Sequence, residues 1–572
     1  MDISRLVARA PGDSGLSLVE AIGIADEPGL GALTIGGYLE DVVARFGMAE
    51  AVSFNTGPNG SDGARLSWSY IDLRDAAMEV AGGLLAGGMQ PGERIGILMT
   101  NRPEFLSAFF GIAMAGGVAV ALSTFSTEDE LAHLVEASEI TTLLMEARVL
   151  KTDFAAMMGS LEPAVDAGAL PGARFAKLRR IAALGDTAQA GIAEWREWLA
   201  TGRDIEEQAV LDRLARVRPE DAGGIFFSSG TTSLPKGIAH SQQAFAIQWW
   251  RWPRLFGMHE PVRAWTGNGF FWSGNISMVV GTGLSTGGCV VLQRFFQADE
   301  ALRVIEAERV TFANGRPHQW ARLQAAERWD AADLSTLKYV PRGEIIWSHP
   351  SVDTDWEVPQ TFGTTETMSA CTCIGREASE ADYAGSYGLP LPGNVLKIVD
   401  PDTREIVPVG DHGEMCIKGP TLMSGYLGKS FADCFDPDGF YCTGDGGRVD
   451  SEGRFFWEGR LTAMIKSGGA NVAPEEIDEI VANWPGVKRA QTVGVADALL
   501  GERVVTCIVP VDGADVDRDG LAAHLKDRLA SFKLPKQILI CSEEDFAMTG
   551  NEKVKPALVR AMAERRLSEN AG

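Results

Sequence analysis

The stretch Phe226 to His240, FFSSGTTSLPKGIAH, collects residue types that can bind phosphate groups, and it begins with an apolar, strand-like run. Gly230 lets the backbone approach oxygen atoms closely, and Lys236 supplies a positive charge. Hydroxyl donors come from Ser228, Ser229, Thr231, Thr232 and Ser233. A loop of this composition can wrap a polyphosphate. It is not a Walker loop, because Lys236 lies between Pro235 and Gly237 and not between glycine and serine or threonine.

Two further segments carry carboxylates that could bind a ligand. Thr361 to Met368, TFGTTETM, offers Glu366 as the hard oxygen ligand that Mg²⁺ prefers. Taken alone, a Thr-Thr-Glu run is more often the N-cap of a helix, so both interpretations stay open. Tyr441 to Asp445, YCTGD, offers a carboxylate that could accept hydrogen bonds from two sugar hydroxyls. Gly444-Asp445-Gly446 is equally typical of a hairpin turn, and ligand-binding carboxylates commonly lie on turns.

Together these segments resemble the adenylate-forming superfamily of acyl-CoA synthetases, luciferases and peptide-synthetase adenylation domains. Five motifs occur in the family order between about Gly63 and Arg560. The resemblance implies that Phe362 lies against adenine, Thr365 near the α-phosphate and Glu366 on magnesium. It assigns Asp445 to the ribose. The nucleotide-binding residues it implies are Ser228, Ser229, Gly230, Thr231, Thr232, Lys236, Phe362, Gly363, Thr364, Asp445 and Arg460.

The C-terminal part resembles the mobile domain of the same superfamily. In MTGNEKVKPALVR, Lys553 matches the catalytic lysine, which would bind the substrate carboxylate and an α-phosphate oxygen. Gly468 and Gly469 match small residues beside the pantetheine arm. Without the surrounding motifs, a simple turn before a helix starting at Pro474 would be the favoured interpretation. Two positions depart from the family. Glu552 replaces the usual glycine before the lysine, and Thr462 replaces the usual hinge aspartate or lysine with a stiffer, β-branched residue.

The segment Thr266 to Gly281, TGNGFFWSGNISMVVG, matches the substrate pocket of these enzymes. It contains no acidic residue, so a substrate ammonium group would have no partner there. Phe271 or Trp272 stands where many acyl-activating relatives carry a histidine. The candidate pocket residues are Trp265, Phe271, Trp272, Gly315 and His318. Aromatic residues of an ordinary core would give the same pattern, so pocket and core both remain open.

The chain has 572 residues, more than one core accommodates, and its pattern predicts an α/β fold. Strands and helices alternate from Leu66 to Ser123 and again from Ile225 to about Val340, which indicates two βαβ subdomains. Short strands and turns from about Pro390 indicate a small β-barrel-like unit. We expect these parts to form one large N-terminal domain, residues 1–459. A small, mobile α+β domain would follow over residues 460–572.

One apolar stretch is nearly long enough to span a bilayer. Phe105 to Ser123, FLSAFFGIAMAGGVAVALS, has no charge. Its Gly116-Gly117 pair falls where a helix would end and a Val-rich strand would begin. We therefore expect this stretch to be buried in the α/β domain and predict no transmembrane segment. No role is assigned to the stretch from about Glu162 to Ala222.

Charge and cysteine content restrict partners and location. Fifty-two basic against 77 acidic residues give a net charge of −25, which argues against nucleic acid as a partner. Of eight cysteines only Cys371 and Cys373 are close in sequence, which predicts neither a disulfide framework nor a CxxC site. The start of the chain lacks the apolar run of a secretory signal. These features favour a reducing cytoplasm.

The resemblance implies an ATP-dependent carboxylate:CoA ligase that uses ATP, Mg²⁺ and coenzyme A. A small-molecule carboxylic acid would become an acyl-adenylate and then a thioester. Two alternatives remain: a ligase that loads the pantetheine of a carrier protein, and a degenerate nucleotide-binding protein suggested by Glu552 and Thr462. The acid is not identified, and a homodimer is left open.

Overall fold

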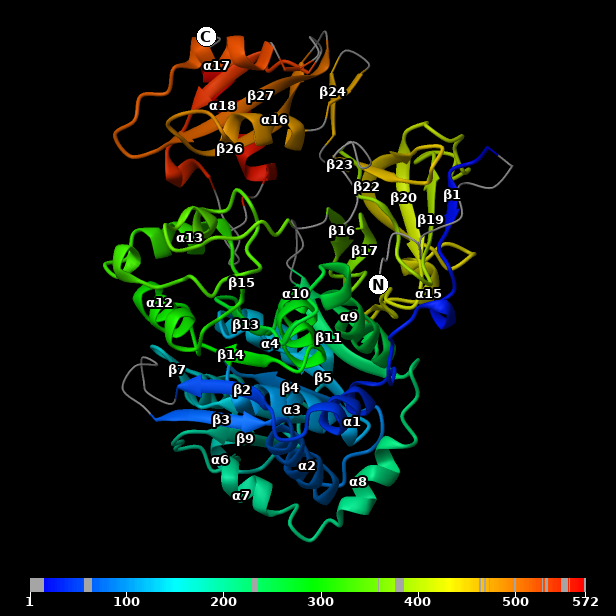
Figure 1. The fold of residues 1–572 in the computed structure, drawn as a ribbon, viewed down its shortest axis with the longest axis vertical. Helices are drawn as coiled ribbons and strands as arrows, with labels where there is room; N and C mark the ends of the chain where they lie inside the picture. Colours follow the sequence, from blue (N-terminus) through cyan, green and yellow to red (C-terminus); the bar gives the residue numbers. More distant parts are fainter. Residues whose placement is uncertain are drawn as a thin grey trace.

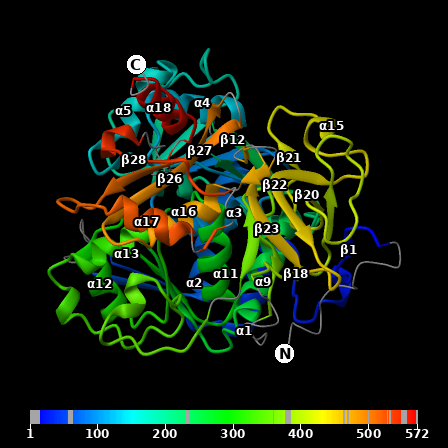
Figure 2. The same cartoon turned by 90° about the horizontal axis from the view of Figure 1, so that it is seen from above.

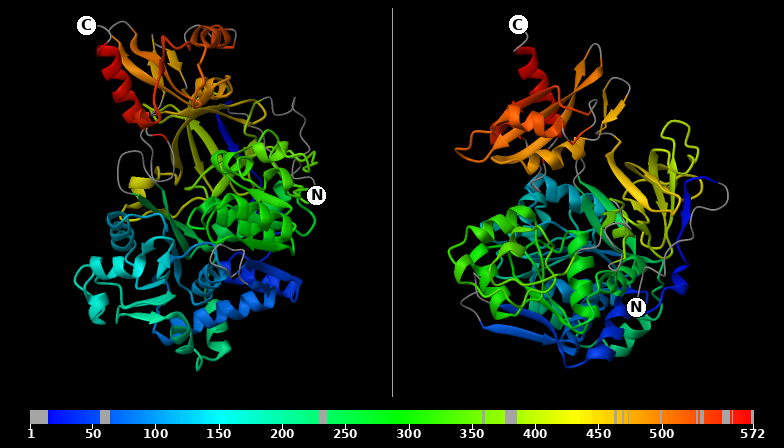
Figure 3. Two further views of the ribbon diagram at one scale, coloured as in Figure 1. Left: turned by 90° about the vertical axis from the view of Figure 1, so that its left-hand side faces the viewer. Right: turned by 45° about the horizontal axis from the view of Figure 1, so that its top comes forward.

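The protein is described by a computed structural model with two parts of unequal size. The described residues are 15–55, 64–228, 235–357, 360–375, 385–461, 464–467, 470–472, 474–497, 500–526, 528–529, 533–546, 554 and 556–569. The C-terminal helices α16 (Pro474–Ala482), α17 (Arg518–Lys526) and α18 (Pro556–Glu569) lie at one end of the molecule, at the top of Figure 1. Side views place the same unit on that end (Figure 3).

An eight-stranded sheet forms the first large layer. Its strands are, in spatial order, β10 (Ile192–Glu194), β9 (Arg180–Leu184), β6 (Thr142–Glu146), β4 (Arg94–Leu98), β5 (Val118–Ala121), β11 (Ala222–Ser228), β12 (Lys236–Ser241) and β21 (Gly425–Tyr426). The first six are parallel to one another, β12 is antiparallel to β11, and β21 is antiparallel to β12. The predicted alternation is confirmed by α2 (Tyr70–Ala86), β4, α3 (Pro103–Met114) and β5. The stretch from about Glu162 to Ala222, to which the sequence assigns no role, supplies β9 and β10 at one edge of this sheet.

A second, five-stranded sheet completes the α/β part. Its order is β15 (Phe312–Asn314), β13 (Arg263–Thr266), β14 (Cys289–Leu292), β2 (Glu50–Asn55) and β3 (Arg65–Ser69). The two predicted subdomains therefore exist, but the chain exchanges strands between them. β2 precedes the first predicted unit yet pairs with β14, and β3 follows β2 into the second sheet, while β11 and β12 join the first sheet. One apolar core, with α1 (Ile35–Phe46), α2, α3 and α9 (Gln242–Leu255), connects both sheets.

The uncharged stretch is buried as predicted. In α3 every residue except Glu104 is buried, Gly116 has φ +76°, and β5 follows directly. The left-handed backbone at Gly116 is what ends the helix, because a side chain there would be strained. Among the described helices, none combines the length and apolar composition needed to cross a bilayer.

The β-rich unit consists of two sheets with a shared core. β1 (Leu18–Glu20), β19 (Val395–Val399), β20 (Gly413–Lys418), β22 (Tyr441–Val449) and β23 (Phe455–Arg460) form an antiparallel sheet in that order. β16 (Thr361–Thr364), β17 (Ser369–Cys373) and β18 (Leu389–Pro390) form the other. Phe362 and Cys371 of the small sheet pack with Leu396, Met415 and Phe455 of the larger one.

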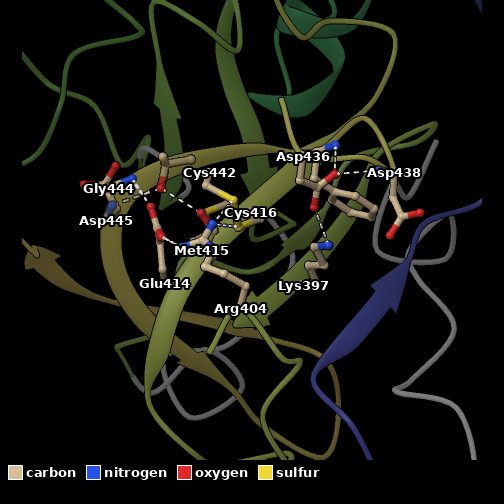
Figure 4. The surroundings of a disulfide bond; sticks show 12 residues. Lys397, Arg404, Glu414, Met415, Cys416, Asp436, Asp438, Cys442, Gly444 and Asp445 are labelled. Atoms are coloured by element: carbon tan, nitrogen blue, oxygen red, sulfur yellow. Dashed lines mark hydrogen bonds and ion pairs between the residues drawn. A yellow bond between two sulfur atoms is a disulfide. The ribbon is translucent and has the colours of Figure 1, made fainter. Parts of the chain in front are cut away.

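One disulfide joins Cys416 of β20 to Cys442 of β22, which face each other in the strand register (Figure 4). The cysteine spacing predicts no disulfide framework, and it does not reveal this bonded pair. The two cysteines are 26 positions apart in the sequence. Only the register of two strands brings them together, and local spacing does not reveal that register.

The C-terminal unit has the predicted α+β composition. A long hairpin of β26 (Val487–Asp497) and β27 (Gly501–Pro510) is extended by β24 (Ile465–Ser467), β25 (Ala470–Val472) and β28 (Gln537–Ile540). α16 and α17 pack in one apolar cluster, and α18 packs in another, against β26 and β27. Seen from above, α16 lies close to β23 of the larger part, and the two are in contact (Figure 2).

Candidate active site

The predicted phosphate loop connects two paired strands. Ser228 ends β11, Lys236 begins β12, and the two residues face each other in the antiparallel register. Ser229, Gly230, Thr231 and Thr232 lie outside the described residues. Lys236 is exposed, and its Nζ lies 5.6 Å from the ring centroid of Tyr426.

Glu366 lies in the turn between β16 and β17 and faces the same tyrosine. Tyr426 Oη donates a hydrogen bond of 2.8 Å to Glu366 Oε1, and 3.0 Å separates the hydroxyls of Tyr426 and Tyr441. Burial and the Glu366 charge raise the pKa of Tyr426, so its hydroxyl remains a donor. Lys236 and Glu366 both lie beside Tyr426, so the three side chains are grouped together. Sequence reasoning missed Tyr426, because only the pairing of β21 with β12 brings it here.

The turn around Glu366 is sterically demanding. The predicted alternative, a helix N-cap, is wrong, since residues 361–373 form a hairpin. A Cβ on Gly363 would lie 1.5 Å from the Ser369 carbonyl oxygen, so only glycine fits there. Thr365 lies in the same turn, which is closed by a 2.8 Å hydrogen bond from the Thr364 backbone N–H to Thr367 Oγ1. Hydroxyl oxygens of Thr364 and Ser369 are buried with no partner among the described residues.

Phe362, the predicted adenine contact, is only 8% exposed. Its ring meets those of Tyr387 and Phe455 edge-on, with centroids 6.3 and 5.3 Å away. Most of this side chain therefore belongs to the core of the β-rich unit. A small exposed part is left for contact with a ligand.

Asp445 is a buried carboxylate with one free oxygen. It is 2% exposed on β22, directly opposite Arg460 of β23. Its Oδ1 accepts a 3.0 Å hydrogen bond from Trp457 Nε1 and lies 3.2 Å from Arg460 Nε. Its Oδ2 has no partner in the described part of the chain. Burial raises the pKa of Asp445, which marks a site that needs donors for its charge.

The backbone around Asp445 is fixed from the neighbouring strand. Gly444 N–H donates to Glu414 Oε1 at 2.9 Å, and Arg404 contacts both Glu414 and Cys442 (Figure 4). Arg460 Nη1 donates to the Thr443 carbonyl at 2.7 Å. These bonds hold the position of Asp445 without using its Oδ2.

The C-terminal unit adds one carboxylate that sequence reasoning missed. Glu475 on α16 is half-buried, and its Oε2 has no partner among the residues described. Burial raises its pKa, and the nearby Asp445 charge raises it further. The predicted Lys553, Gly468 and Gly469, like the departures Glu552 and Thr462, lie outside the described residues.

Asparagines and a glutamine hold the candidate pocket segment by its backbone. Asn101 Nδ2 donates to the Asn268 carbonyl at 2.8 Å, and Asn101 Oδ1 accepts from the Phe270 N–H at 2.9 Å. Asn275 Nδ2 donates to the Gly269 carbonyl at 3.0 Å. Asn314 Nδ2 donates to Asn275 Oδ1 at 3.1 Å, and Gln319 Nε2 donates to the Gly267 carbonyl at 2.8 Å. The residues of this network come from four separate segments, so no local motif predicts it.

Aromatic rings from this segment line a cavity of about 80 Å³. Phe271 and Trp272 have centroids 4.8 Å apart, and the 64% exposed Phe125 meets Phe271 edge-on at 5.7 Å. Pro235, at the end of the predicted phosphate loop, also lines this cavity.

The other predicted pocket residues lie elsewhere. Trp265 is fully buried in a core cluster with Trp320. A Cβ on Gly315 would lie 2.6 Å from the Trp320 ring, so this glycine permits close packing. His318 is half-buried on α13 (Pro317–Gln324) and does not line the described cavity.

Comparison with known proteins adds family evidence. The sequence matches the family described as AMP-binding enzyme over residues 39–427 and the AMP-binding enzyme C-terminal domain over residues 476–553. It is 29% identical to a feruloyl-CoA synthase of Amycolatopsis sp, over 86% of this chain and 93% of that protein. It is 30% identical to an indoleacetate–CoA ligase of Aromatoleum aromaticum, over 87% of this chain and 94% of that protein.

Solved structures share the fold over nearly the whole chain. An anthranilate CoA ligase in complex with anthranoyl-AMP matches with a TM-score of 0.75 at 21% identity, covering 95% of this chain and 99% of that one. An amide bond synthetase from Marinactinospora thermotolerans matches with a TM-score of 0.72 at 26% identity, covering 92% and 99%.

Proposed function

The chain belongs to the AMP-binding enzyme family, and from this membership we propose that it is an ATP-dependent carboxylate:CoA ligase. The carboxylate oxygen of the acid attacks the α-phosphorus of ATP, which gives acyl-AMP and releases pyrophosphate. The thiol of coenzyme A then attacks the acyl carbon and releases AMP. Adenylation turns a poor leaving group into a good one before the thioester forms.

The observation that carries this proposal is the buried Asp445 with its unpartnered Oδ2. Ribose hydroxyls are neutral donors of the kind this oxygen needs, and they would satisfy the carboxylate without adding a charge. Arg460, paired with Oδ1, keeps the carboxylate oriented and its own charge near the nucleotide.

Lys236, Tyr426 and Glu366 would form the phosphate end of the site. Glu366 offers hard carboxylate oxygens to Mg²⁺, which when bound neutralises charge on the triphosphate. Tyr426 holds the carboxylate in place through its 2.8 Å hydrogen bond, and Lys236 brings a point charge to the same side.

The acid is proposed to have an apolar body. Phe271, Trp272 and Phe125 supply aromatic surface beside the phosphate loop. The segment from Thr266 to Gly281 lacks acidic residues, and Glu130 of α4 (Glu128–Ser138) is the one carboxylate among the cavity's described lining residues. The relatives named for feruloyl and indoleacetate substrates support an aromatic or similarly apolar acid.

The test separates the two half-reactions. Labelled pyrophosphate should exchange into ATP only when a suitable carboxylic acid is present, and AMP should be released when coenzyme A is added. Exchange absent across a broad panel of acids would defeat the ligase proposal and favour a nucleotide-binding protein. Thioester formed on a purified carrier protein but never on coenzyme A would defeat the choice of thiol acceptor.

A further inference from the structure

Gln248 ties α9 to the hairpin that carries Glu366. It is fully buried on α9, and its Nε2 donates to the carbonyl oxygens of Met368 and Ala370, both at 2.8 Å. These two carbonyls belong to the chain that leaves the Glu366 turn and enters β17. The two N–H groups of one side-chain amide therefore hold the hairpin at two points.

The backbone that Gln248 holds has a disfavoured conformation. Met368 and Ser369 are consecutive residues other than glycine with φ +50° and +82°, in the left-handed region. Such residues keep this conformation only where their surroundings impose it. Within the hairpin, Thr367 Oγ1 donates to the Ser369 carbonyl at 2.9 Å. Gln248 supplies two further bonds from outside the hairpin, and Glu366 lies only two residues before Met368.

The elements that hold Glu366 also hold the predicted phosphate loop. α9 begins directly after β12, whose first residue is Lys236. On the other side of the turn, the Met423 N–H donates to the Glu366 carbonyl at 2.7 Å, and Tyr426 Oη donates to Glu366 Oε1. Tyr426 lies on β21, which pairs with β12. Glu366 is thus fixed from two sides by elements attached to the strand that carries Lys236.

One carboxylate oxygen of Glu366 remains available. Oε1 accepts the bond from Tyr426, and no bond to Oε2 is formed among the described residues. The side chain is half-buried, so this oxygen can meet a ligand. A carboxylate oxygen is the kind of ligand that Mg²⁺ prefers. Its direction depends on the backbone of the turn, which is the part that Gln248 holds.

We propose that Gln248 is a positioning residue for Glu366 and, through it, for the divalent cation of the nucleotide. This inference rests on the proposed ligase function and adds a residue that touches neither substrate nor cation. Without its two bonds, Met368 and Ser369 can leave the left-handed region, which turns the Glu366 carboxylate away from the phosphate side. The nucleotide should then still bind, while the contribution of the cation to binding is lost.

The experiment measures the dissociation constant of α,β-methylene ATP by calorimetry, with and without Mg²⁺. This analogue cannot be cleaved between its α- and β-phosphates, so the ratio of the two constants reports only what the cation adds to binding. Gln248→Met removes both donors at nearly the same side-chain length.

Gln242→Met is the matched control. Gln242 is buried on the same helix, but its Oε1 accepts from the Ile35 N–H at 3.0 Å and its Nε2 donates to the Ala222 carbonyl at 3.3 Å. It therefore loses two buried hydrogen bonds that do not involve the hairpin.

We expect Gln248→Met to reduce the gain in affinity from Mg²⁺ by about 10-fold, the size of one contact to a charged group. The constant without Mg²⁺ should stay unchanged. Acid-dependent pyrophosphate exchange should fall as well, and raised Mg²⁺ should restore part of its rate. Gln248→Asn, which withdraws the amide by one methylene group, should give a smaller loss. Gln242→Met should keep the wild-type gain even where urea unfolding shows a similar loss of stability.

A gain from Mg²⁺ that is unchanged in Gln248→Met would overturn the role of Gln248, and so would the same loss in Gln242→Met. If Gln248→Met does not fold, Gln248→Asn decides in the same assay. Failure of both to fold beside a folded Gln242→Met would assign Gln248 to stability alone. These results leave the ligase proposal standing. Wild-type protein that neither binds the analogue nor shows acid-dependent exchange would overturn that proposal, and this inference with it.

Discussion

At the scale of single residues, Asp445 is the side chain whose surroundings most clearly require a ligand. One of its oxygens is bound by Trp457 and Arg460, and the other is buried and unpartnered in the described part of the protein. Leaving such an acceptor unsatisfied costs roughly 1–3 kcal/mol. A ligand that donates hydrogen bonds recovers this free energy.

We therefore expect Asp445→Asn to raise KM for ATP by about 10- to 100-fold, because an amide offers only one acceptor oxygen to the ribose hydroxyls. KM for the acid should change little. Steady-state pyrophosphate exchange at varied ATP checks this. Asp438→Asn, exposed in the same β-rich unit, is the control. An unchanged KM for ATP in Asp445→Asn would remove Asp445 from the nucleotide site.

His240 should make stability depend on pH. Its ring is fully buried on β12, and neither nitrogen has a partner among the described residues. Burial lowers the pKa of His240 from 6.5 to about 4. Between these values the unfolded chain binds a proton that the folded protein does not, so stability falls as pH decreases from about 6.5 to 4. The full effect is about 3 kcal/mol.

His240→Leu should remove this contribution and flatten the dependence. Urea unfolding of the wild type and of His240→Leu at pH 7 and pH 4.5 gives, for each protein, the change in the free energy of unfolding between the two pH values. Equal changes in the two proteins would mean that His240 is protonated in the folded state or reaches solvent.

Residue types in the local motifs predicted part of the site. Asp445 and Arg460 prove to be opposite each other across β22 and β23. Tyr426 and the asparagines around the pocket segment could not be predicted, because strand pairing and long-range contacts bring them in. The cysteine pair was missed for the same reason.

At the scale of elements, periodicity and turn residues predicted the first α/β alternation and the hairpins of the β-rich unit. The alternation that predicts α2, β4, α3 and β5 is local, and so is the composition that predicts the hairpins of the β-rich unit. The assignment of strands to sheets is not local. β2 pairs with β14, about 240 residues later, and apolar strands of similar composition could have paired otherwise.

The hairpin of β16 and β17 should depend on Gly363. A Cβ there would collide with the Ser369 carbonyl, and the register shifts at this point. We expect Gly363→Ala to cost at least about 1–3 kcal/mol of stability and to reduce adenylation, because Glu366 follows within the same turn. Denaturant unfolding and pyrophosphate exchange measure both effects. In Gly274→Ala, the control, the added methyl group meets only Met278 Cε at 3.7 Å. Equal stability of the two variants would contradict the steric argument.

At the scale of the whole molecule, the two parts meet beside Asp445 and Arg460, the residues proposed to bind the nucleotide. α16 of the C-terminal unit contacts β23, the strand that ends with Arg460. Glu475 of α16 thereby comes close to Asp445, and burial together with the Asp445 charge raises the pKa of Glu475. A nucleotide that donates hydrogen bonds to Asp445 would change the electrostatic interaction between Asp445 and Glu475. We therefore expect nucleotide binding to be coupled to the relative position of the two parts.

The resemblance of the C-terminal part to the mobile domain predicts a role for Lys553 in only one half-reaction. We expect Lys553→Ala to lower acid-dependent pyrophosphate exchange by about 100- to 1,000-fold, the size of one preorganised electrostatic contact in a transition state. The conversion of supplied acyl-AMP to thioester should keep most of its rate, because the acid is already activated. Both rates can be measured on the same preparation, with Lys555→Ala as the neighbouring control. If Lys553→Ala slows both steps equally, the lysine supports the C-terminal unit as a whole and does not act on adenylation. If neither step slows, the catalytic lysine lies elsewhere in the chain.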